Sequence, residues 1–250
     1  MSSLSVVLVG GAGPPAPLEF ASLIAALDPT RPVVPVDMVA FHGWQPVPDF
    51  SMATETTALL RSMDEAGTAR GHMVGYSGGA AVVLAVACAY PECVASLTLE
   101  EVAWIGSDGA TALETSFWSD LAVAMALPSY EALLRFRDLM VRPEARGSLP
   151  PVTKDAPWID SMVDGVRASM GAFAGAEVDW ATLQGADFPI YAAVGSLSNP
   201  VFELRSRRLA ERVPRATVEV FQGMHHVAPP HRRAAEEWAG TLEAMWTRAE

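Results

Sequence analysis

The stretch Gly71-His72-Met73-Val74-Gly75-Tyr76-Ser77-Gly78-Gly79-Ala80 decides the fold. Residues 71–76 form a short run that predicts a buried strand, and this run leads directly into Ser77. Residues 80–90 follow and are apolar on every side, which predicts a helix surrounded by protein, as when it packs against a central sheet. A serine between a strand and a buried helix is expected on a tight turn at the edge of the sheet.

The residues around Ser77 are small enough for such a turn. Gly75 and Gly79 leave room on either side, because a Cβ atom there would collide with the neighbouring strand or helix. Gly78 supplies a backbone N–H at a helix N-terminus, where it can face a developing oxyanion. The Gly-x-Ser-x-Gly pattern is common by chance, and a merely flexible turn is the alternative. The strand before Ser77 and the helix after it favour this serine as a catalytic nucleophile.

Strands and helices alternate on both sides of this turn, which favours an α/β fold with a doubly wound, mostly parallel sheet. The expected strands are 6–9, 33–36, 71–76, 94–99, 188–194 and 216–221, and the expected helices of the sheet are 17–27, 51–66, 80–90, 201–212 and 231–248.

The alternation breaks at about residue 105, where further segments of helical character begin. We therefore predict one core domain formed by residues 1–104 and 181–250, with a helical cap of residues 105–180 inserted after the fourth strand. The cap is expected over the carboxyl edge of the sheet, where such sheets bind ligands. The segment and the residue just before it are rich in aromatic residues and Met, which favours a small apolar substrate: Trp104, Phe117, Trp118, Met125, Trp158, Met162, Met170 and Phe173.

Composition limits the partners of the chain. Its 250 residues include 17 basic and 29 acidic residues, a net charge of −12, which argues against nucleic acid and anionic membranes as partners. We find neither a signal-like N-terminus nor an apolar stretch long enough to span a membrane, and expect a cytoplasmic protein. Two cysteines, Cys88 and Cys93, cannot build a disulfide framework and are expected to be buried thiols. The oligomeric state, including a homo-oligomer, stays open.

A serine nucleophile needs an imidazole within hydrogen-bond reach, and the order of the chain restricts the choice. Of the five histidines, His225 and His226 lie directly after the last expected strand, and His231 is an early position of the final expected helix. Adjacent side chains leave the backbone in different directions, so only one of the two can act as the base. His42, His72 and His231 are expected in structural positions. Since no paired metal-ligand spacing occurs, neither a metal nor another cofactor is expected.

With these residues in view, the chain resembles the α/β-hydrolase superfamily from Val6 to Trp246. It begins at the strand before the oxyanion loop, where many relatives have His-Gly and this chain has Gly10-Gly11. The resemblance implies that the N–H groups of Ala12 and Gly78 form the oxyanion hole.

The resemblance also bears on the choice of base. The segment from Gly223 through His226 to Pro229 is similar to the Gly-x-Gly-His-x-Ala-Pro form of many relatives, whereas Gly223-Met224-His225 resembles a smaller group with Gly-Met-His. We favour His226, and His225 remains the alternative.

The acid is the main departure from the family pattern. Most relatives carry it in a Gly-x-x-Asp turn, but residues 195–200 hold no carboxylate, and Ser198 or Asn199 could orient an imidazole only weakly. A second location in the superfamily follows the next strand after the nucleophile helix, where this chain has Glu100 and Glu101. Adjacent strand residues face opposite sides, so only one of them can reach the base.

We favour Glu101 as the acid, with Glu100 as the alternative. The spacing from Ser77 to Glu101 resembles that in the haloalkane dehalogenases and in the mycotoxin lactonase that opens zearalenone. The dehalogenases have an aspartate nucleophile, so Ser77 excludes their chemistry.

The resemblance implies a serine hydrolase that cleaves an ester, lactone or thioester bond through an acyl-Ser77 intermediate. Because one fold supports many reactions, a non-hydrolytic lyase, cyclase or isomerase of small-molecule biosynthesis is the alternative. A non-catalytic ligand receptor is a third class, which the intact Ser and His disfavour.

Overall fold

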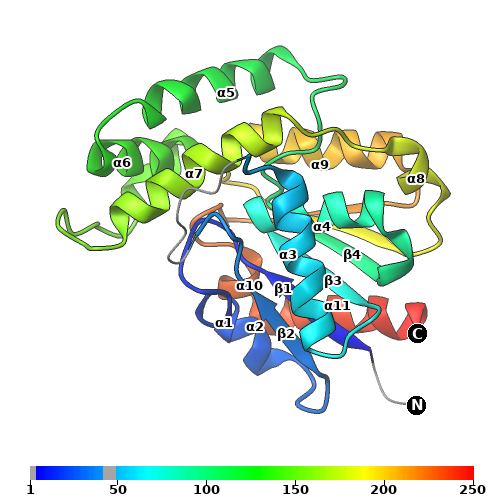
Figure 1. Cartoon of the computed structure of the whole chain (residues 1–250). Coiled ribbons are helices and arrows are strands. Elements are labelled where there is room, and N and C mark those ends of the chain that lie inside the picture. Colours follow the sequence, from blue (N-terminus) through cyan, green and yellow to red (C-terminus); the bar gives the residue numbers. More distant parts are fainter. Residues whose placement is uncertain (1–3, 42–48) are drawn as a thin grey trace.

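A computed structural model describes residues 4–41 and 49–250. Six parallel strands form one sheet in the order β2-β1-β3-β4-β5-β6 (Figure 1). This confirms the α/β class and the parallel sheet expected from the sequence. The strands are β1 (Ser5–Val9), β2 (Val33–Val36), β3 (Gly71–Tyr76), β4 (Val94–Glu100), β5 (Ile190–Gly195) and β6 (Thr217–Phe221).

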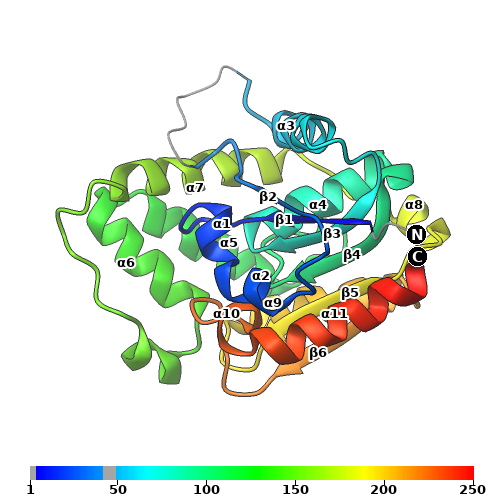
Figure 2. The same ribbon diagram turned by 90° about the horizontal axis from the view of Figure 1, so that it is seen from below.

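Helices cover both faces of the sheet, as Figure 2 shows. Those on one face are α3 (Met52–Glu65), α4 (Gly78–Ala89), α8 (Trp180–Gly185) and α9 (Pro200–Arg212). Those on the other face are α1 (Ala16–Glu19), α2 (Ala21–Ala26) and α11 (Ala235–Ala249), and the short α10 (Pro230–Arg233) precedes α11. None of the helices in the described ranges is long and apolar enough to cross a membrane.

The central strands β3 and β4 are buried along their whole length, because helices pack on both of their faces. The apolar helix α4 packs against them, and most of its residues are buried, as its sequence predicts. Its Cys88 is half-buried rather than buried, and burial raises the pKa of that thiol to about 11. Cys93 is also half-buried.

Two expected helices are each divided in two, and one helix was not expected. Residues 17–27 divide at Phe20, and residues 231–248 divide at Ala234, whose φ of −134° is not helical. The short helix α8 follows Asp179, whose side chain accepts a hydrogen bond from the Thr182 N–H. This N-cap is the signal that could have predicted the helix.

Three of the helices that lie between β4 and β5 along the chain form a group that we call the inserted helices. They are α5 (Ala112–Met125), α6 (Ser129–Met140) and α7 (Ile159–Ala174). A capping box formed by Thr111 and Glu114 begins α5, and Pro128 precedes α6. Figure 2 shows the inserted helices beyond one end of the sheet, next to the loops that follow β1 and β3.

The register of the sheet brings two turns of the site together. Tyr76 at the end of β3 pairs with Glu100 at the end of β4, and Glu100 pairs with Ala193 of β5. The residues that follow, Ser77 and Glu101, therefore leave the sheet at the same carboxyl edge. That edge is where open parallel sheets bind their ligands.

Candidate active site

Ser77 lies on a strained turn between β3 and α4. Its φ of 54° and ψ of −116° are uncommon for a residue with a side chain. The turn is fixed by two backbone hydrogen bonds: the Ser77 N–H donates to the Glu100 carbonyl at 2.9 Å, and the Ser77 carbonyl accepts from the Ala103 N–H at 3.1 Å. Strain that is held in this way by neighbouring elements is typical of functional sites.

The glycines beside Ser77 are required by close packing, as the sequence predicts. A Cβ atom on Gly75 would lie 2.5 Å from the Ala80 Cα, and one on Gly79 would lie 2.2 Å from the Val9 carbonyl oxygen. These distances are far below van der Waals contact. The pattern is therefore needed for the turn to pack against β1 and α4.

The two residues expected to form an oxyanion hole lie beside Ser77. Ala12 and Gly78 line, together with Ser77, a small cavity of about 50 Å³. Gly78 is the first residue of α4, where N–H groups have no partner within the helix. The loop that carries Ala12 touches the serine, since a Cβ atom on Gly11 would lie 2.9 Å from the Ser77 Cβ.

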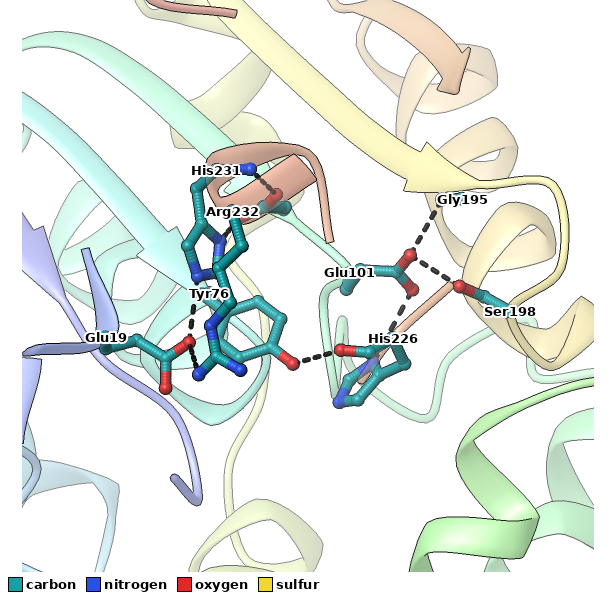
Figure 3. Close-up of polar contacts among 9 residues, drawn as sticks. Glu19, Tyr76, Glu101, Gly195, Ser198, His226, His231 and Arg232 are labelled. Carbon is teal, nitrogen blue, oxygen red and sulfur yellow. Dashed lines mark hydrogen bonds and ion pairs between the residues drawn. The ribbon is translucent and has the colours of Figure 1, made fainter. Parts of the chain in front are cut away.

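His226 and Ser77 line a second, larger pocket of about 760 Å³. The His226 ring stacks on Phe202 with ring centroids 4.4 Å apart, and its carbonyl accepts a hydrogen bond from the Tyr76 hydroxyl (Figure 3). Its Nδ1 lies 3.5 Å from Oε2 of Glu101. With Nδ1 facing the carboxylate, Nε2 is the ring nitrogen left for a hydroxyl in the pocket.

Glu101 is fully buried and has a φ of 53°. Its Oε1 accepts hydrogen bonds from the Gly195 N–H at 2.7 Å and from the Ser198 hydroxyl at 2.5 Å, as Figure 3 shows. Among the described residues, neither Oε2 of Glu101 nor Nδ1 of His226 has a hydrogen-bond partner, and 3.5 Å is too long for a good one. Such distances are common in empty sites and shorten when substrate binds.

Ser198 thus contacts the carboxylate rather than the imidazole. Its turn, residues 195–200, fixes a carboxylate that follows the end of β4.

His225 lies apart from this group. Its Nε2 is 3.3 Å from the Ser148 hydroxyl, and it lines neither of the two cavities beside Ser77. Burial lowers the pKa of His225, which keeps the ring neutral. The structure brings His226, and not His225, to Glu101.

Glu100 has a different partner. Its Oε2 lies 2.5 Å from Nδ1 of His231, and its Oε1 accepts the His231 backbone N–H at 3.0 Å. The other ring nitrogen of His231 is 2.8 Å from Oε1 of Glu19, which also pairs with Arg232 (Figure 3). We call these four residues, Glu19, Glu100, His231 and Arg232, the His231 cluster.

Burial disfavours the charged form of His231, but the two carboxylates outweigh it and raise the pKa of this histidine to about 9. His231 is structural, as expected, but its partner Glu19 was not foreseen. The signal that could have predicted this contact is a charged residue on the apolar face of the expected helix 17–27.

Of the two remaining histidines, His72 lies in the part of the chain that the structure describes. His72 is buried, with Nδ1 2.9 Å from the Ser96 hydroxyl and Nε2 3.2 Å from Glu250, a structural position as expected. His42 lies outside the described residues. Within the described ranges, no three His, Cys, Asp or Glu side chains are grouped so that they could hold a metal ion.

The inserted helices supply much of the wall of both cavities. Six of the eight aromatic and Met residues noted in the sequence line one cavity or the other: Phe117, Trp118, Met170 and Phe173 line the small one, and Trp158 and Met162 line the large one. Trp104 and Met125 belong to the buried core instead.

Comparisons with known proteins identify the fold of the chain. Neither a scan of known protein families nor a search of curated proteins finds a match to this sequence. Many solved structures are similar in fold.

Three of these structures illustrate the similarity. The enol-lactonase from Burkholderia xenovorans LB400 has a TM-score of 0.73 at 19% identity, over 99% of this chain and 92% of that one. A meta-cleavage product hydrolase from Pseudomonas fluorescens IP01 has a TM-score of 0.72 at 18% identity, over 100% and 92%. The naproxen esterase (carboxylesterase NP) from Bacillus subtilis has a TM-score of 0.67 at 18% identity, over 96% and 84%. The chain has the α/β-hydrolase fold.

Proposed function

We propose that this chain is a serine hydrolase that cleaves an ester, lactone or thioester bond of a small, largely apolar substrate through an acyl-Ser77 intermediate. One observation carries the proposal: Ser77 and His226 line the same pocket, and Nδ1 of that histidine faces the buried carboxylate of Glu101. A nucleophile, a base and a group that orients the base are the arrangement that activates a serine hydroxyl. The structures of similar fold include an esterase and a lactonase, which is consistent with this class.

In the first half-reaction, Nε2 of His226 takes the proton of the Ser77 hydroxyl while Oγ attacks the carbonyl carbon. The backbone N–H groups of Ala12 and Gly78 hold the oxygen that becomes negative. Each such donor contributes about 3–4 kcal/mol to the lowering of the barrier. Collapse of the tetrahedral intermediate breaks the bond to the leaving group, which receives its proton from His226.

In the second half-reaction, His226 takes a proton from water as the water oxygen attacks the acyl carbon. Collapse of this second tetrahedral intermediate breaks the bond to Oγ of Ser77, which takes the proton back from His226 as the acid leaves. Glu101 acts throughout by contact with Nδ1 of His226. It fixes the tautomer in which Nε2 is free to accept a proton, and its charge stabilises the imidazolium.

The inserted helices are proposed to act as a cap over the site, within the inserted segment 105–180. They contribute apolar residues to both cavities that meet at Ser77. A cover of this kind excludes water from the carbonyl and binds the apolar part of the substrate.

Labelling with a fluorophosphonate probe tests the nucleophile. The wild type is expected to react with the probe and to release p-nitrophenol from short p-nitrophenyl esters, whereas Ser77→Ala does neither. Mass spectrometry of a trapped acyl-enzyme should place the added mass on the peptide that contains Ser77. Persistent labelling of Ser77→Ala would overturn the assignment, and a folded wild type that neither reacts nor turns over esters would favour the non-hydrolytic alternative.

A further inference from the structure

A buried arginine lines the small cavity beside Ser77. Arg205 of α9 is 1% exposed, and its side chain is packed among apolar residues of the inserted helices. Its contacts are long: Nε lies 3.5 Å from Glu114, and Nη1 lies 3.5 Å from the Val102 carbonyl oxygen. Nη2 is buried and has no hydrogen-bond partner in the part of the chain that the structure describes.

The charge around Arg205 is not balanced. Arg208 also contacts Glu114, with Nη1 at 2.7 Å, so that two buried guanidinium groups share one carboxylate. The group of three therefore carries one excess positive charge. A buried charge without a partner is costly, and an anion in the cavity would remove that cost.

Aromatic rings surround the guanidinium of Arg205 but offer it no oxygen. Its Cζ lies 5.1 Å from the Phe117 ring, 5.2 Å from the Trp118 ring and 5.8 Å from the Phe202 ring. These contacts stabilise the cation and hold it in place. They leave the N–H groups at the edge of its plane available for an acceptor.

A second unsatisfied polar group lines the same cavity. The hydroxyl of Ser169, on α7, is buried and has no hydrogen-bond partner among the described residues. The rest of the cavity wall is largely apolar. Two residues from different helices, one with a buried cation and one with a buried hydroxyl, thus line one small space next to the nucleophile.

The position of His226 tells which part of a substrate would enter this space. His226 gives its proton to the leaving group, and it lines the larger pocket but not the small one. The leaving group therefore occupies the larger pocket, and the acyl chain occupies the small cavity. That cavity, about 50 Å³, has room for about four groups the size of water.

We propose that the small cavity is an acyl subsite for a short chain that ends in a carboxylate, which pairs with Arg205 and accepts a hydrogen bond from Ser169. The preferred substrates are then half-esters of short dicarboxylic acids with a larger, largely apolar alcohol. The assignment of the acyl side rests on the proposed function.

Two esters that differ only at the acyl terminus test this preference. Monobenzyl succinate carries a carboxylate where benzyl 4-methylpentanoate carries an isopropyl group of similar shape. A charge-assisted hydrogen bond predicts that the wild type has a kcat/KM about 10- to 100-fold higher for the succinate ester. Equal values, or a preference for the neutral ester, would overturn the proposal.

Two matched variants show where a preference originates. Arg205→Met and Arg208→Met each remove one guanidinium from Glu114, but only Arg205 lines the cavity. The preference should be lost or reversed in Arg205→Met and retained in Arg208→Met. An equal loss in both variants would contradict a specific subsite. The ratio of two kcat/KM values on one preparation does not depend on how much of the variant is folded.

Binding to Ser77→Ala separates this inference from the proposed function. In calorimetry, monobenzyl succinate should bind this variant at least about tenfold more tightly than the neutral ester. Tighter binding without turnover by the wild type would support the subsite and contradict the hydrolase. Turnover without any preference in rate or binding would support the hydrolase and contradict the subsite. Should Arg205→Met fail to fold, Ser169→Ala replaces it, with a smaller loss of preference expected.

Discussion

Glu100 and Glu101 are neighbours in the chain, yet their carboxylates contact different histidines. Glu101 turns toward Nδ1 of His226 at 3.5 Å, and Glu100 lies 2.5 Å from Nδ1 of His231. The division follows from the geometry at the end of β4, where successive side chains leave on opposite faces of the sheet. One carboxylate thus faces the proposed active site, and the other belongs to the buried His231 cluster.

Substitution of each glutamate by glutamine separates these two roles. We expect Glu101→Gln to lower kcat about 10³- to 10⁴-fold, because the imidazolium loses its carboxylate partner and the amide favours the wrong tautomer. Glu100→Gln should act mainly on the free energy of unfolding. Steady-state kinetics measures kcat of both variants, and urea unfolding measures their free energy of unfolding. Equal mild effects on kcat would contradict the role of Glu101 in the proposed triad.

The adjacent histidines offer a similar comparison. His226→Asn is expected to abolish ester turnover, since it removes the ring that faces Glu101 and the pocket. His225→Asn should retain most of kcat, because His225 contacts Ser148 and lies outside both cavities. The reverse order of activities would transfer the role of base to His225.

The loop before α1 provides a steric test of the proposed oxyanion hole. A Cβ atom on Gly11 would lie 2.9 Å from the Ser77 Cβ, whereas one on Gly10 would make ordinary contacts of 3.6 Å with Ala16. Gly11→Ala should therefore displace the loop or the serine and lower kcat about 100-fold. Gly10→Ala should change kcat little. Both variants are compared by kinetics and by the rate of labelling with a fluorophosphonate probe.

Tyr76 precedes the serine, and its hydroxyl donates a hydrogen bond to the carbonyl of His226. Tyr76→Phe leaves that buried carbonyl without its donor and loosens the segment that positions the imidazole. We expect kcat to fall roughly tenfold while KM changes little. A larger effect on KM than on kcat would instead indicate that Tyr76 contacts the substrate in the pocket that it lines.

The His231 cluster predicts a dependence of stability on pH. Although burial opposes it, contact with the two carboxylates raises the pKa of His231 from 6.5 to about 9 in the folded protein. The stabilisation by protonated His231 is therefore complete below about pH 6.5 and is lost as the pH rises through about 9. It is on the order of 3 kcal/mol. The difference in free energy of unfolding between wild type and His231→Gln, measured by urea unfolding, should shrink across this range.

His72 serves as a control, because its contribution to stability should depend on pH in the opposite direction. Burial lowers its pKa from 6.5 to about 4, so the neutral form is the one the fold favours. Any advantage of wild type over His72→Gln should therefore diminish as the pH falls from about 6.5 to 4. A parallel pH dependence of the two variants would contradict both assignments.

The sequence by itself determined the order in which strands and helices follow one another along the chain, and it determined the position of the serine turn. Val6–Val9, Gly71–Tyr76 and the apolar segment 80–90 can be stable only when buried, so their pattern predicts a parallel sheet covered by helices. Gly75 and Gly79 marked the turn because a larger residue cannot pack there. These are local properties, which neighbouring residues fix.

Tertiary structure decided which charged groups meet. The contacts of Glu19 with His231, of Ser198 with Glu101 and of Arg205 with Glu114 join residues far apart in the chain. Such contacts depend on the register of the sheet and on how α9 and the inserted helices pack, which no local pattern encodes. The sequence could therefore narrow the acid to two adjacent glutamates, whereas only the folded chain placed one of them beside His226.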